Sequence, residues 1–96
     1  MKFEDDHFTS NRIDPDKTIP LTLPEHLAVS RVVAKARIGE GIDTSTYAGR
    51  MHIRFLQLAV RLAIALVMIQ DGARIRDICR IIGHAFLAWA DEYGSE

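Results

Sequence analysis

The sequence predicts a mostly α-helical protein: a three-helix arrangement with a central apolar helix and an extended N-terminal arm. Residues 24–38, 45–70 and 74–93 each carry apolar side chains at the spacing of one helix face. Residues 1–21 show no such period and contain proline and aspartate in turn-like combinations. Because 96 residues is the length of one small domain, we expect residues 1–96 to form a single helical domain.

The N-terminal arm is predicted to be extended and to contain a turn. Asp14-Pro15-Asp16 combines residues that favour turns. The apolar residues of this segment are too many for a disordered tail, so we expect the arm to pack on the helices or to become ordered on a partner, with a short strand near residues 18–22. These apolar residues are Phe3, Phe8, Ile13, Ile19, Leu21 and, just after the arm, Leu23.

The first helix is predicted to begin with a capping box. Thr22 can accept a hydrogen bond at the helix start, and Glu25, three residues later, can return one. We expect this helix to span residues 24–38 and to stop at Gly39 or Gly41. Its predicted core stripe consists of Val29, Val32, Val33 and Ala36.

The second helix carries three arginines inside the most apolar stretch of the chain, "RMHIRFLQLAVRLAIALVMIQDG". Arg50, Arg54, Gln57 and Arg61 are separated by 4, 3 and 4 residues, which places them on one narrow helix face. We expect this face to be a solvated polar stripe and the other faces to be buried. The second half, "LAIALVMI", has no polar side chain, so the arm or another subunit must cover one of its sides, and homodimerisation stays open.

Neither a membrane span nor a secretory signal is expected. Only fifteen positions separate Arg54 from Gln70, fewer than the roughly 20 apolar residues that a span needs. Arg61 would lie near the bilayer centre, at considerable energetic cost. The opening residues, "MKFEDDHF", are acidic and lack an apolar segment, and the single cysteine suits a reducing compartment, so we expect a cytoplasmic protein.

The third helix follows a short connection and should pack antiparallel to the second. Asp71-Gly72 is predicted to end the second helix, and Gly94 to end the third. Cys79 falls in the apolar set of the third helix, where we expect a buried and unreactive thiol. Two glycines inside the predicted helices either mark close approaches or are simply tolerated: Gly49 and Gly83.

No catalytic or metal-binding pattern is present, so we expect a protein that is not an enzyme and that uses no metal and no cofactor. The four histidines lack the spacing of metal ligands, both with each other and with Cys79. There is no glycine-rich phosphate loop and no nucleophile motif. The acids gather in the terminal segments, where we expect them to be solvated rather than tuned for acid–base chemistry.

One segment, "RIRDICRIIGHAFLAWADEYG", suggests DNA binding. "IRDICRIIG" resembles the first helix and turn of helix-turn-helix domains, with Gly83 at the turn. The second half, "AFLAWADEY", is apolar and then acidic, whereas a recognition helix offers polar and basic side chains to DNA. We therefore expect one continuous helix and no direct contact with nucleic acid. A small helix-turn-helix-like phage regulator that binds DNA is the alternative.

The whole chain carries a broader resemblance than any motif. The run "MKFEDDHFTSNRIDPDKTIPLTLPEHLAVSRVVAKARIGEG", joined to "RFLQLAVRLAIALVMIQDGARIRD", resembles phage-encoded anti-CRISPR proteins that act on type I systems, with type I-F the closer expectation. The resemblance implies a non-enzymatic inhibitor in the cytoplasm of a bacterial host. Such an inhibitor binds subunits of a CRISPR RNA-guided surveillance complex and blocks target DNA binding or nuclease recruitment. That group shares no motif or common fold, so no functional residue can be transferred from it.

Charge layout gives the candidate contact residues. Residues 1–25 hold six acids and three bases, residues 26–80 hold nine bases and four acids, and residues 81–96 hold three acids and no base. A surveillance complex presents lysine- and arginine-rich grooves, and carboxylates pair strongly with such side chains. The predicted partner-binding residues are therefore the acids Asp5, Asp6, Asp14 and Asp16, with Asp91 and Glu92 second. A competing set, Arg50 and Arg54, would meet acidic groups on the partner.

Overall fold

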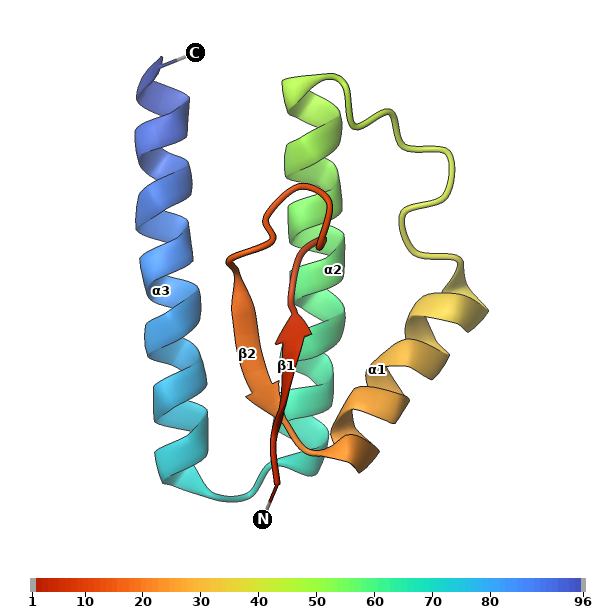
Figure 1. Cartoon of the computed structure of the whole chain (residues 1–96), viewed down its shortest axis with the longest axis vertical. Helices are drawn as coiled ribbons and strands as arrows, with labels where there is room; N and C mark the ends of the chain where they lie inside the picture. The colour runs from red at the N-terminus through yellow and green to blue at the C-terminus, as the bar shows by residue number, and fades with distance from the viewer. Residues whose placement is uncertain (1, 96) are drawn as a thin grey trace.

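The computed structural model describes residues 2–95, with side chains described through Tyr93. It confirms the predicted mostly helical architecture with three helices, and it adds a small two-stranded sheet. Figure 1 shows α2 and α3 running antiparallel, α1 diverging from α2, β1 in front of α2, and β2 between α2 and α3 in this view. The elements in chain order are β1 (Glu4–His7), β2 (Thr18–Leu21), α1 (Leu23–Ala36), α2 (Tyr47–Met68) and α3 (Gly72–Ser95).

The N-terminal arm is a β-hairpin packed on the helices, which is one of the two outcomes that its apolar content predicted. β1 and β2 pair antiparallel from Glu4 opposite Leu21 to His7 opposite Thr18. The alternating pattern of a strand turns one set of side chains inward, and Ile19 and Leu21 are each only 1% exposed. Phe8, directly after β1, is fully buried. The hairpin therefore supplies part of the hydrophobic core.

The start of α1 agrees with the prediction, and its core stripe agrees only in part. The capping box is present, and the Thr22 backbone N–H donates to Glu25 Oε1 at 2.8 Å. The helix ends at Ala36, before the predicted glycines, because Arg37 adopts the left-handed conformation with φ of 54°. Val29 is buried and Val33 packs against the core. Val32 and Ala36 are exposed, contrary to expectation, because α1 diverges from α2 and buries only a narrow side (Figure 1).

The connection between α2 and α3 differs from the prediction. α2 ends at Met68, and Asp71-Gly72 starts α3 instead of ending α2. The Asp71 carboxylate accepts a hydrogen bond from the Ala73 backbone N–H at 2.9 Å, as an N-terminal cap does. Asp-Gly is compatible with both roles, so the sequence alone could not separate them. Gly94 also lies inside α3 rather than beyond it.

α3 is one continuous helix, as predicted, and passes through Gly83 without a turn. Ile78, Ile82 and Trp89 form its buried side. Cys79, one helical position from Ile78, is exposed, so the prediction of a buried thiol was wrong. The predicted apolar set is wider than the side of α3 that the hairpin and α2 actually cover.

The two internal glycines have different roles. At Gly49 an added Cβ would lie 1.7 Å from the backbone oxygen of Asp43, so this glycine allows the loop before α2 to approach the helix. At Gly83 an added Cβ would meet nothing within 4 Å. Gly49 therefore marks a close approach, whereas Gly83 faces open space.

Candidate functional site

The arginine face of α2 is covered by the hairpin, so the prediction of a solvated stripe was wrong for most of its length. Arg54 is 4% exposed and Arg61 is 9% exposed. Their charges are compensated by acids from the N-terminal arm, which the sequence analysis had placed in solvent. A buried charge is tolerated only when it is paired and hydrogen-bonded, and each arginine meets that condition.

Arg54 is held by two carboxylates. Its Nε and Nη2 donate to the two oxygens of Asp14 at 2.9 and 3.1 Å, and its Nη1 lies 2.8 Å from Glu92 Oε2. Thr9 donates its hydroxyl to Asp14, and the guanidinium lies 5.3 Å from the centre of the Trp89 ring. Burial disfavours the charged guanidinium, but the hydrogen bonds to Asp14 and Glu92 outweigh it and raise the pKa of Arg54. This group therefore joins the hairpin, α2 and α3.

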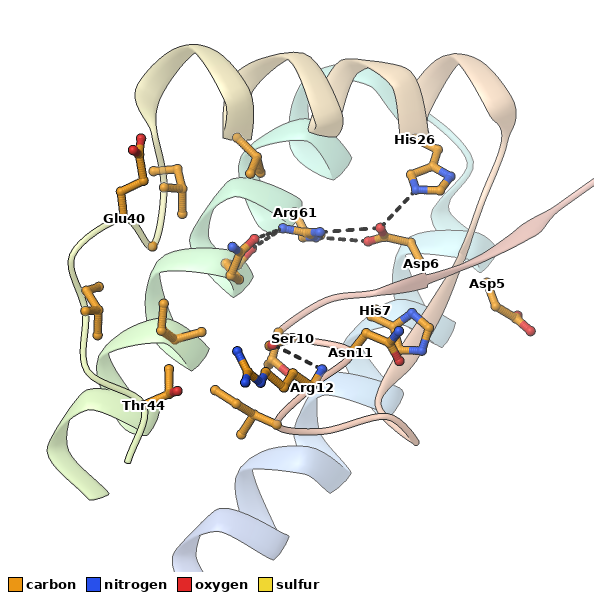
Figure 2. A pocket seen from close by; sticks show the side chains of 18 residues that line it. Asp5, Asp6, His7, Ser10, Asn11, Arg12, His26, Glu40, Thr44 and Arg61 are labelled. Carbon is orange, nitrogen blue, oxygen red and sulfur yellow. Dashed lines mark hydrogen bonds and ion pairs between the residues drawn. The ribbon is translucent and has the colours of Figure 1, made fainter. Parts of the chain in front are cut away.

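Arg61 forms a second buried pair about two turns further along α2. Its Nε lies 2.9 Å from Asp6 Oδ2 and its Nη1 donates to the side chain of Gln57. His26 of α1 lies between two carboxylates of β1, with Nδ1 2.8 Å from Glu4 and Nε2 3.4 Å from Asp6. Figure 2 shows Asp6 between Arg61 and His26, with a dashed line to each of them. These interactions connect α2, β1 and α1.

A third pair connects α3 to α1. Arg74 donates to both oxygens of Glu25, at 2.9 and 2.7 Å, and also to the backbone oxygen of Pro20 at 3.4 Å. The hydrogen bond from Arg74 is the main reason that the pKa of Glu25 is lowered. We call the three pairs, Arg54–Asp14, Arg61–Asp6 and Arg74–Glu25, the arginine clasp. Together they tie all three helices to the hairpin or to each other.

A cleft of about 690 Å³ opens beside the second pair of the clasp (Figure 2). One wall comes from the hairpin and its turn and carries His7, Asn11 and Arg12; the opposite wall comes from α1, α2 and the loop between them. The charge of Arg61 is already matched by Asp6. A ligand that bound Arg61 would have to displace Asp6, whereas Arg12 in the wall of the cleft is exposed.

The described residues bring no catalytic or metal-binding constellation together. Within residues 2–95, no group of three or more His, Cys, Asp or Glu side chains is arranged to hold a metal ion. The polar side chains that do converge belong to the arginine clasp.

The predicted contact residues separate into two sets. Asp6, Asp14 and Arg54 are buried in the clasp, and Glu92, with its side chain 38% exposed, also pairs with Arg54. The remaining acids face outward: Asp5, Asp91, and Asp16, whose side chain is 75% exposed beside Lys17. Arg50 is half-buried, donates to the backbone oxygen of Ser45 at 3.3 Å and lies over the Tyr47 ring.

α2 is long and apolar enough to cross a membrane by length and composition alone, as the core helix of a soluble protein also can be. The fold ties α2 to the hairpin: Arg54 and Arg61 project from its middle into buried ion pairs. Phe55, Leu66 and Val67 are exposed, so the prediction that the other faces of this helix are buried was wrong in part. Crossing a bilayer as a single helix would separate both arginines from their carboxylates. The ion pairs therefore favour the core role.

Comparisons with protein-family models, with curated proteins and with solved structures found no match to this chain.

Proposed function

We propose that this chain is a non-enzymatic protein inhibitor that binds a CRISPR RNA-guided surveillance complex and blocks its binding to target DNA. The resemblance of the sequence to anti-CRISPR proteins names the partner class. The observation that supports it is the division of charge: Arg54, Arg61 and Arg74 are neutralised inside the clasp, while Asp5, Asp16 and Asp91 face outward. The clasp neutralises one acid for each of these arginines, so the support for the proposal comes from the acids that stay exposed.

Outward carboxylates suit a partner whose function is to hold nucleic acid. Such a partner is rich in lysine and arginine, and opposite charges raise the association rate and fix the docking orientation. Asp5 on β1 and Asp16 in the hairpin turn belong to one element, so they can reach one groove together. Asp91, near the end of α3, offers a further contact.

DNA binding by a helix-turn-helix gains no support. The proposed turn at Gly83 falls in the middle of continuous α3. The residues after it that face outward include Phe86, Leu87 and Asp91, which give a duplex neither phosphate contacts nor base-edge donors. We therefore keep the inhibitor as the proposed function.

The test is an electrophoretic assay of target DNA binding by a purified type I-F surveillance complex, with the chain added in increasing amounts. The unaltered chain is expected to abolish DNA binding near a one-to-one ratio. Asp5→Lys, Asp16→Lys and Asp91→Lys, each made alone, are expected to raise the amount required by about tenfold, as loss of a charge contact does. Asp77 is an exposed acid on α3, so Asp77→Lys is the matched control and is expected to inhibit as the unaltered chain does.

Two results would count against this proposal. DNA binding that is unaffected by the unaltered chain, with no complex in a pull-down, would reject the partner. Inhibition that is equal in all four variants would reject the three acids as contacts.

A further inference from the structure

A second surface of the protein is apolar and uncovered by the described residues. It consists of two rows, which we call the α2/α3 apolar face. The row on α2 is Phe55, Ala59, Leu62 and Leu66, and the row on α3 is Cys79, Gly83, Phe86 and Ala90. Both rows have spacings of 4, 3 and 4 residues, so each lies along one side of its helix. Neither row contains a charged residue.

The two rows lie side by side. The rings of Phe55 and Phe86 are stacked with their centres 6.0 Å apart. Closer to the start of α2 and the end of α3, the rings of Tyr47 and Tyr93 meet edge to face, with their centres 5.2 Å apart. Because the two helices run antiparallel, the Leu66 end of the α2 row lies towards the Cys79 end of the α3 row (Figure 1). A Cβ added at Gly83 would meet nothing within 4 Å, so the space above this residue is open.

The hairpin cannot cover this face. Successive residues of an α-helix are turned by about 100°, so the row that begins at Phe55 lies roughly a third of a turn around α2 from Arg54 and Arg61. Those arginines point to the hairpin through Asp14 and Asp6. The exposed fractions agree: Leu66 is 76% exposed, Phe55 is 46% exposed and Phe86 is 41% exposed.

The chain exposes more surface than a monomer of its mass typically does, and the large apolar side chains of the two rows contribute to it. Phe55, Leu62, Leu66 and Phe86 are each at least 36% exposed. A standard interface buries about 800 Å² from each partner. The surface of the whole chain, 6103 Å², also exceeds the about 5500 Å² typical of a monomer of 10.8 kDa.

We propose that a second copy of this chain occupies the α2/α3 apolar face. The two rows are apolar and fit the same rows of a second copy, and a two-fold dimer brings the same patch of both copies together. The two α2 and two α3 helices then form a four-helix layer, with one hairpin on each outer side. Asp5 and Asp16 stay accessible in this arrangement, so dimer formation does not depend on the proposed inhibitory contacts.

The oligomeric state of the full chain tests this proposal. Sedimentation equilibrium is expected to give twice the chain mass of 10.8 kDa at roughly 100 µM, and dissociation on dilution. Leu66→Lys is expected to give a monomer, because it places a charge within the apolar row of α2. Leu87→Lys is the matched control: Leu87 is 67% exposed on α3 but lies outside the row, so this variant is expected to remain dimeric.

Cys79 provides an independent readout, since it is a free, exposed thiol within the α3 row. Its reaction with a maleimide is expected to slow by about tenfold or more between dilute and concentrated protein, and Leu66→Lys is expected to remove that dependence. Circular dichroism and Trp89 fluorescence must show that Leu66→Lys is folded; if it is not, Ala59→Glu, on the same face, replaces it.

A monomer at every concentration, with constant Cys79 reactivity, would overturn the proposal. Vesicles of phosphatidylcholine and phosphatidylglycerol provide a further arm of the test. Sedimentation of a monomeric chain with these vesicles, prevented by Leu66→Lys, would assign the face to a lipid surface and would equally overturn the dimer.

Discussion

Arg54 of α2 and Asp14 of the hairpin turn, 40 positions apart in sequence, form a buried bidentate ion pair with distances of 2.9 and 3.1 Å. This pair fixes where the N-terminal arm lies on the central helix. Arg61 and Asp6 repeat the arrangement further along α2 at 2.9 Å. The arm is thus part of the folded core, and Asp5 and Asp16 are among its residues that stay exposed.

Breaking the Arg54–Asp14 pair is expected to destabilise the protein strongly. Asp14→Ala leaves a buried guanidinium with Glu92 as its remaining carboxylate, and removal of one partner of a buried pair costs about 3–5 kcal/mol. Urea unfolding, followed by the fluorescence of Trp89 beneath Arg54, measures this loss. Asp16→Ala, in the same turn but exposed, is the control and should change the free energy of unfolding by less than about 0.5 kcal/mol. Equal losses in both variants would contradict a structural role for Asp14.

The Arg74–Glu25 pair predicts a loss of stability in acid. The Arg74 hydrogen bond lowers the pKa of Glu25 in the folded protein below its ordinary value of 4.5, so the unfolded chain takes up this proton first as pH falls. The stabilisation is fully present above pH 4.5 and is lost as pH falls through the lowered pKa. Glu25→Gln should therefore be less stable than the unaltered chain at pH 7, and the difference should shrink towards pH 3. A difference that does not change with pH would contradict the ionic character of this pair.

Gly49 is expected to tolerate no side chain without movement of the preceding loop. In Gly49→Ala the added Cβ would overlap the Asp43 backbone oxygen, and the hydrogen bond from the Gly49 N–H to Thr46 would be strained. We expect a loss of about 2 kcal/mol or more in the free energy of unfolding. Gly72→Ala, where an added Cβ meets nothing within 4 Å, should stay within about 0.5 kcal/mol of the unaltered chain. A neutral Gly49→Ala would show that the loop packs elsewhere.

Asp71 is expected to stabilise α3 as its N-terminal cap. Asp71→Ala removes the acceptor for the Ala73 N–H and should lower the free energy of unfolding by about 1 kcal/mol. Asp71→Ser keeps an acceptor and should restore most of that loss. If Asp71→Ala leaves the free energy of unfolding unchanged, the capping role of Asp71 is contradicted.

The sequence predicted the helices well because helix periodicity is local. The spacing of Arg50, Arg54 and Arg61 correctly identified one face of one helix, but it could not identify what covers that face. The acids show why: Asp5 and Asp6 are neighbours in sequence, yet the strand turns Asp5 outward and Asp6 into a buried pair. Which of the two is buried depends on the register of the hairpin on α2, and that is set by contacts between residues far apart in sequence.

The same limit applies to the apolar face of α3. The periodicity includes Cys79 and Phe86, but packing covers only the side around Ile78 and Trp89. The width of an apolar stripe is visible in a sequence, whereas the angle at which a helix is packed is not. For this reason the sequence predicted a buried thiol where the structure exposes one.

The most direct test of the proposed function is a titration of target DNA binding by the type I-F surveillance complex with two forms of the chain: unaltered, and carrying both Asp5→Lys and Asp16→Lys. The unaltered chain is predicted to abolish DNA binding near a one-to-one ratio. The double variant is predicted to have an unchanged unfolding midpoint. It is predicted to require at least about tenfold more protein to abolish DNA binding. DNA binding that persists unchanged in an excess of the unaltered chain would contradict the proposed function.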